Sequence, residues 1–141
     1  MKKRTYLTLG SVGAVSLLLV SSTSAYANWS SHIEGGRPGF ASRVWADKSY
    51  TEVTFKGCRP TEPASNFDKS VDIQLYTAGF GDKVGPLKHF TKCFELSTST
   101  ATWTGLPKGL YYFKIVKIGG ESHELKKIDV DQVRVDTTLA D

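Results

Sequence analysis

The sequence predicts an all-β protein, with a single antiparallel β-sandwich of roughly six to eight short strands over residues 28–141. Apolar residues mostly alternate with polar ones in this region, and β-branched and aromatic residues are common in the alternating segments. Glycine and proline recur between them, as in Gly35-Gly36-Arg37-Pro38-Gly39, Gly79-Phe80-Gly81-Asp82 and Gly105-Leu106-Pro107-Lys108-Gly109. Short alternating segments separated by such turns are typical of sandwiches and barrels.

Residues 1–27 have the pattern of a cleavable secretory signal peptide. Lys2, Lys3 and Arg4 precede an apolar run, and the small residues Ala25 and Ala27 follow it. The run is about 15 residues long and is interrupted by polar residues and glycines, whereas a transmembrane helix needs roughly 20 apolar residues. We therefore expect cleavage after Ala27, an extracellular product and no stable membrane insertion.

The strands can be placed coarsely along the rest of the chain. The last of them carries two apolar pairs, Ile128 with Val130 and Val133 with Val135, which are out of step by one residue. This offset predicts a β-bulge near Asp131-Gln132. The alternating segments comprise residues 29–33, 41–45, 50–58, 71–76, 89–96, 101–103, 110–118 and 128–135.

The two cysteines, Cys58 and Cys93, predict one disulfide bond in an oxidising compartment. Such a crosslink is worth roughly 3–4 kcal/mol in the chain-entropy account. Strict alternation, however, turns both cysteines away from the core. Two arrangements remain open: the bridge joins strands on the outer surface, or a bulge at Gly57 turns Cys58 inward.

One stretch resembles a known family. Residues 102–115 contain a short strand with Trp103, a glycine–proline turn, and Tyr111 at the start of the next strand. This order resembles immunoglobulin-like and fibronectin-type-III-like sandwich domains. The resemblance implies an immunoglobulin-like sandwich in which Tyr111 is the corner tyrosine, with its hydroxyl bonded to nearby backbone. A fold resemblance of this kind does not define a function.

Composition argues against several functional classes. Lys2, Lys3 and Arg4 account for much of the net charge of +4, because the chain has 18 basic and 14 acidic residues in total. The remaining chain lacks the basic excess of a nucleic-acid-binding protein. The three histidines, His32, His89 and His123, are far apart, and no hydrolase, metalloprotease or P-loop motif occurs. We expect no catalytic residues, no metal site and no cofactor.

The sequence instead suggests a binding protein. Aromatic residues on polar positions of strands can stack on sugars or anchor protein interfaces, and lysines around one hairpin can meet an anionic partner. We expect the partner to be another protein or a cell-surface polysaccharide. The alternatives are a secreted toxin or antimicrobial protein, and a protease inhibitor that uses the 105–109 loop. The candidate binding residues are Trp29, Tyr76, Tyr112, Lys83, Lys88, His89 and Lys92.

Overall fold

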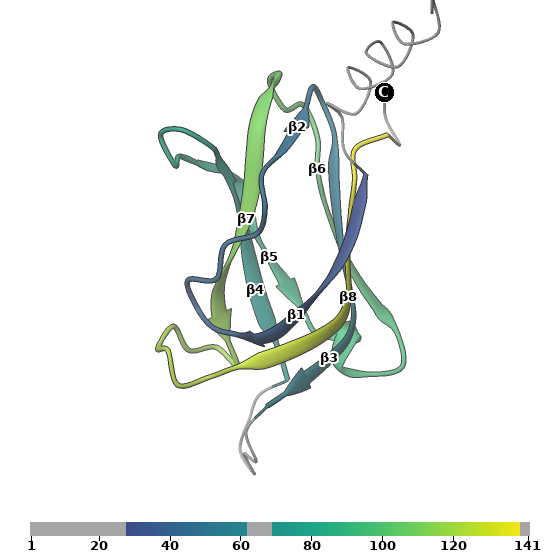
Figure 1. The fold of residues 1–141 in the computed structure, drawn as a ribbon, viewed down its shortest axis with the longest axis vertical. Helices are drawn as coiled ribbons and strands as arrows, with labels where there is room; N and C mark the ends of the chain where they lie inside the picture. Colours follow the sequence, from purple (N-terminus) through teal and green to yellow (C-terminus); the bar gives the residue numbers. More distant parts are fainter. Residues whose placement is uncertain (1–27, 62–68, 139–141) are drawn as a thin grey trace, which may run out of the picture.

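The computed structural model describes residues 28–61 and 69–138, so the predicted signal peptide lies outside the described residues. A short 3-10 helix, η3 (Lys92–Phe94), follows the fifth of eight strands in this part of the chain (Figure 1). The strands are β1 (Trp29–Gly36), β2 (Trp45–Asp47), β3 (Thr51–Pro60), β4 (Val71–Thr77), β5 (Lys83–Phe90), β6 (Thr98–Trp103), β7 (Gly109–Ile118) and β8 (Ile128–Asp136).

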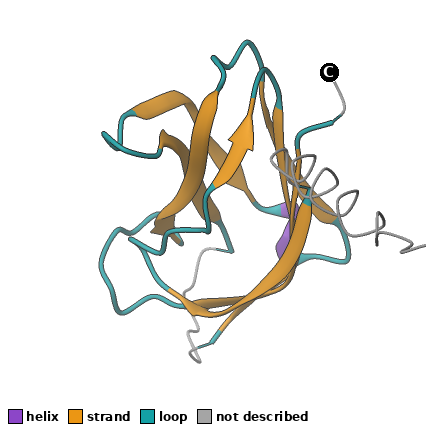
Figure 2. Ribbon diagram, turned by 45° about the horizontal axis from the view of Figure 1, so that its top comes forward, coloured by secondary structure: helices purple, strands orange, loops and turns teal. Residues whose placement is uncertain are grey.

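The strands form two four-stranded antiparallel sheets (Figure 2). The first sheet has the order β1-β8-β3-β6, and the second has the order β2-β7-β4-β5. The inward faces of the two sheets bury a common apolar core, as alternation requires of a sandwich. The predicted all-β sandwich is therefore confirmed.

Aromatic residues from both sheets meet at the centre of the core. The ring centroid of Phe55 on β3 lies 5.1 Å from that of Phe90 and 5.6 Å from that of Phe113, both in edge-to-face arrangements. Trp103 on β6 is 3% exposed and belongs to the same core. Each large apolar side chain buried in this way contributes roughly 1.5–3 kcal/mol to stability.

The two cysteines form a disulfide bond inside the core. Cys58 is 4% exposed and Cys93 is 1% exposed. Val53 and Phe55 point inward from β3, so strict alternation would turn Cys58 outward. Gly57 has a φ of 70°, a conformation that favours glycine, and it shifts the alternation by one residue. Of the two arrangements left open by the sequence, the inward turn at Gly57 is confirmed.

The neighbouring strand β8 carries a matching irregularity. Asp131 and Gln132 are both exposed between the buried Val130 and Val133. The register between β8 and β1 shifts at this point. The register between β8 and β3 is preserved, because each of these two strands has one extra residue and the two extra residues lie opposite each other. The bulge predicted near Asp131-Gln132 is therefore confirmed.

The predicted strand over residues 89–96 is wrong. Strand β5 ends at Phe90, and the chain then makes a helical turn. The amide of Phe94 donates to the carbonyl of Thr91 at 3.2 Å, and the amide of Cys93 donates to Ser99 Oγ at 2.9 Å. This turn aims Cys93 inward at Cys58, whereas an extended chain would have aimed it outward.

Tyr111 occupies the position expected for a corner tyrosine. It is buried at the start of β7, and its hydroxyl donates to the carbonyl of Pro107, four residues upstream. Burial raises the pKa of Tyr111, and the negative charge of Asp47 raises it further. The last strand departs from the immunoglobulin arrangement: β8 pairs with β1 and β3, whereas in those domains the last two strands share one sheet.

Candidate functional site

Tyr76 and Tyr112 form a stacked pair on the outer face of the second sheet. They are opposite each other on the adjacent strands β4 and β7. Their ring centroids are 5.6 Å apart and their planes are inclined by 18°. Alternation explains the placement, because the neighbouring Leu75 and Phe113 are both fully buried and thereby turn the two tyrosines outward.

Two lysines flank the tyrosine pair. The ammonium nitrogen of Lys114 lies 5.1 Å from the ring centroid of Tyr76 and 5.9 Å from that of Tyr112. Lys83 on the edge strand β5 is the cross-strand partner of Tyr76, so its side chain shares the same sheet face. We call these four residues the tyrosine patch. Its chemistry is aromatic at the centre and cationic on both sides.

Exposed apolar residues lie beside the tyrosine patch. Leu110 is 54% exposed on β7, two positions before Tyr112, and therefore shares its face. Phe80 is 96% exposed in the turn between β4 and β5. The amide of Ala78 in this turn donates to the carbonyl of Leu110 at 2.8 Å, which holds the turn next to β7. An exposed phenylalanine and leucine beside two tyrosines are typical of an interaction surface.

The other basic residues of the candidate set are spread along and beyond β5. His89, at the far end of the strand from Lys83, pairs with Asp72, with 2.5 Å between His89 Nδ1 and Asp72 Oδ1. The ammonium nitrogen of Lys88 lies 5.6 Å from the ring centroid of Trp103, on the side of the other sheet. Lys92 belongs to η3. The structure brings Lys83 to the tyrosines and places the other three apart from them.

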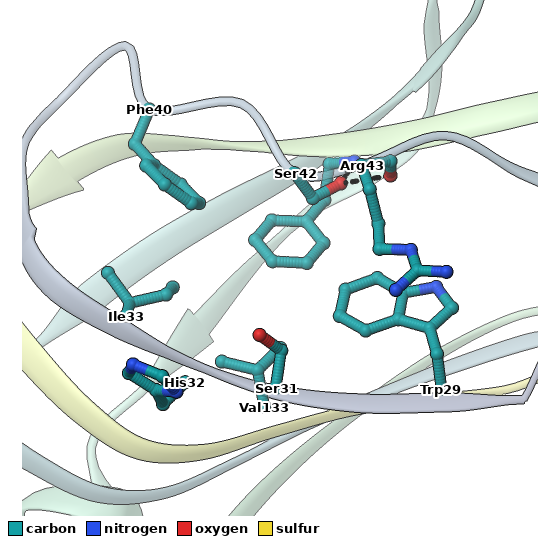
Figure 3. Close-up of a pocket in the computed structure, with 9 residues that line it drawn as sticks. Trp29, Ser31, His32, Ile33, Phe40, Ser42, Arg43 and Val133 are labelled. Atoms are coloured by element: carbon teal, nitrogen blue, oxygen red, sulfur yellow. Dashed lines mark hydrogen bonds between the residues drawn. The ribbon is translucent and has the colours of Figure 1, made fainter.

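Trp29 lies in the other sheet, on strand β1. Its ring centroid is 6.1 Å from that of Trp45, and the guanidinium carbon of Arg43 lies 5.1 Å from it. Trp29 lines a cavity between β1 and the chain segment that leads to β2 (Figure 3). It is therefore not part of the tyrosine patch.

The histidines are distributed over separate elements, and each contacts a different carboxylate. His32 on β1 contacts Glu34, and His123 in the loop between β7 and β8 contacts Glu121. Within residues 28–61 and 69–138, no group of three or more histidine, cysteine, aspartate or glutamate side chains could hold a metal ion.

Comparison with known proteins gives no family, since neither a protein-family model nor a curated protein sequence matches the chain. In the part of the chain that the structure describes, no helix is long and apolar enough to cross a membrane.

Sequence reasoning missed Lys114, Leu110 and Phe80 as members of this surface. The first two could have been found, because positions 110, 112 and 114 alternate on one face of a single strand. Phe80 lies in a turn, where no periodicity reports which way a side chain points. The position of this turn beside β7 depends on the pairing of β4 with β7, which a local pattern does not contain.

Proposed function

We propose that the chain is a secreted, non-enzymatic binding module with an immunoglobulin-like core, and that its tyrosine patch recognises a partner protein with an acidic surface. The observation that carries this proposal is the stacked Tyr76–Tyr112 pair with Lys83 and Lys114 beside it. Tyrosines of this kind are enriched at protein interfaces, because a large apolar ring and a hydroxyl are presented at low cost in conformational entropy.

The arrangement of the rings favours a protein over a glycan. Sugars stack on the open face of an aromatic ring, whereas Tyr76 and Tyr112 turn faces toward each other and Lys114 lies over both rings. Each ring therefore has one face turned toward the other ring, and the ring edges, the hydroxyl groups and the lysine charges are offered to a partner together. Phe80 and Leu110 add apolar area beside them.

The immunoglobulin-like part of the proposal is supported by strand pairing. Strand β3 pairs with β6, and β4 pairs with both β5 and β7. These are the neighbours that strands B, C, C′, E and F have in immunoglobulin domains. The hydrogen bond from Tyr111 to Pro107 supports the same relation. On this proposal, β2 and β8, the strands that precede and follow this set in the chain, have exchanged sheets relative to that family.

The loop over residues 105–109 offers less to a partner. Leu106 is 6% exposed, and its amide donates to the carbonyl of Ser49 at 3.0 Å. The carbonyl of Pro107 accepts the hydroxyl of Tyr111. The loop is therefore anchored to the core through its central residues, and the tyrosine patch is the better candidate surface.

The test compares residues 28–141 with a Tyr76→Ala/Tyr112→Ala variant on immobilised extracellular proteins and on a glycan array. We expect saturable protein binding that the double variant weakens at least about tenfold, as loss of a central aromatic anchor does. Leu125→Ala is the matched control, because Leu125 is 74% exposed in the β7–β8 loop, away from the patch.

Electrostatic recognition is tested on the same partner. Lys83→Gln and Lys114→Gln should slow association and reduce its salt dependence, because exposed charges mainly steer encounter. Protein binding that the tyrosine variant leaves intact contradicts the proposal. Binding to glycans alone contradicts the choice of a protein partner.

A further inference from the structure

The two long sides of the sandwich differ in how they are closed. On one side, Trp103 of β6 reaches the edge strand of the other sheet, and its indole nitrogen donates to the carbonyl of Pro86 at 3.1 Å. On the opposite side, the edge strand β1 faces the segment over residues 39–43. Two backbone hydrogen bonds pair this segment with β7. The amide of Ile115 donates to the carbonyl of Phe40, and the amide of Ser42 donates to the carbonyl of Phe113, both at 2.9 Å.

A cavity of about 150 Å³ lies between β1 and that segment. Figure 3 shows the side chains of Phe40 and Ile33 on one side of this space and Trp29 on the other. Phe113 and Val133 from the core complete the apolar lining. An apolar cavity of roughly this volume accommodates one benzene-sized ring. The walls therefore fit a single six-membered ring better than a chain of sugars.

Two of the residues that line the cavity, Trp29 and Arg43, carry hydrogen-bond donors without acceptors in the described part of the chain. The guanidinium of Arg43 stacks on the Trp29 ring and forms no ion pair with any residue that the structure describes. The indole nitrogen of Trp29 is buried and has no acceptor in the same part of the chain. By contrast, Ser42 is satisfied, since it donates to the carbonyl of Arg43 and accepts from the amide of Phe113, both at 2.9 Å.

Charge at this site favours an anion. Arg43 and His32 are the basic side chains that line the cavity, and the carboxylate of Glu34, which is not part of the lining, lies 3.4 Å from His32 Nε2. An unpaired guanidinium beside an unsatisfied indole N–H binds a carboxylate well, because both are strong donors and a carboxylate is acceptor-only.

From this geometry we propose a second binding site, in which the cavity holds a six-membered apolar ring and Arg43 and Trp29 bind a carboxylate attached to it. The ligand class is a small aromatic carboxylic acid. This site is separate from the tyrosine patch, so the proposal stands whether or not the patch binds a protein.

The test is an NMR titration of residues 28–141 with benzoate, followed through the indole N–H signal of Trp29. Benzamide and benzylamine serve as the neutral and cationic counterparts, and glucuronate as a carboxylated sugar ring. We expect saturable shifts with benzoate, and an affinity about tenfold higher than for benzamide, because a charge-assisted hydrogen bond replaces a neutral one.

Two variants separate the charge from the cavity. Arg43→Gln should reduce benzoate affinity about tenfold and leave benzamide binding unchanged. Phe40→Ala should weaken both ligands, because it removes one wall. The matched control is Arg134→Gln, which removes an exposed arginine that pairs with Asp136 on β8. The Tyr76 and Tyr112 signals report that each variant remains folded.

Several results would overturn the proposal. The first is the absence of saturable shifts with benzoate, and the second is equal affinity for benzoate, benzamide and benzylamine. The third is an Arg43→Gln variant that binds benzoate as well as the parent does. The fourth is tighter binding of glucuronate than of benzoate.

Discussion

Gly57 shows how one residue redirects a strand. Its φ of 70° belongs to the left-handed region, and a Cβ added there would lie 2.8 Å from the Cβ of Asp131 on the neighbouring strand. Both the backbone angle and the close approach of β8 therefore require glycine. The consequence is the inward turn of Cys58, without which the disulfide could not lie in the core.

We expect Gly57→Ala to lower the free energy of unfolding by about 2–3 kcal/mol, from strain in the left-handed region and from overlap with Asp131. Gly105→Ala is the matched control. Its φ of 65° is similar, but no atom lies within 4 Å of the added Cβ, so the cost is about 1 kcal/mol from the backbone alone. Urea unfolding measures both variants, and equal losses would contradict the overlap with Asp131.

Single residues also show what sequence reasoning could and could not resolve. The choice between an outward and an inward bridge depended on Gly57, and the sequence showed the glycine but not its φ. The outward position of Tyr76 and Tyr112 followed from alternation alone. Trp29 lies on the other sheet, and no local pattern could separate it from the tyrosines, because sheet membership is set by long-range pairing.

At the scale of elements, β5 is the strand that the sequence obscured. Gly85 and Pro86 interrupt its alternation and shift its register with β4 between Leu75 and Ile73. Proline is tolerated on an edge strand, because its missing N–H faces away from the sheet. Where the register shifts, a side chain of β4 supplies hydrogen bonds to β5. The side-chain amide of Gln74 donates to the carbonyls of Val84 and Gly85 at 3.0 and 3.1 Å.

Gln74 should therefore hold the edge strand in place. It is 5% exposed, so Gln74→Leu leaves two carbonyls without their donor and should cost about 1–3 kcal/mol. We expect faster hydrogen exchange in β5, with β1 and β8 unchanged. Gln132→Leu is the control of the same chemistry on an exposed position of β8. Uniform loss of protection across both sheets would show instead that Gln74 stabilises the whole sandwich.

At the scale of the whole molecule, the sandwich was predictable and its connections were not. Alternation defines which residues of each strand face inward, and enough strands of that kind must pack as two layers. Which strand lies beside which depends on pairing between residues far apart in the chain. The placement of β8 beside β3 is such a case. The turn at η3 is another, because the disulfide with Cys58 holds Cys93 in the core although the local pattern favours an extended strand.

The disulfide joins the two ends of a long excursion through the fold. Cys58 lies near the end of β3. The chain then builds β4 and β5 in the other sheet and returns to the first sheet after Cys93. The bond closes this circuit between two cysteines that are 35 positions apart in the sequence. It therefore restricts the conformations open to the unfolded chain, which is the main source of disulfide stabilisation in the chain-entropy account.

Reduction of the bond should lower the free energy of unfolding by roughly 3–4 kcal/mol. The Cys58→Ala/Cys93→Ala variant should lose more than the reduced parent, because both sulfurs are buried and their removal leaves a cavity in the core. Urea unfolding with and without reductant measures the first effect, and the variant under the same conditions measures the second. An unchanged midpoint on reduction would mean that packing between the sheets, rather than the crosslink, holds this circuit closed.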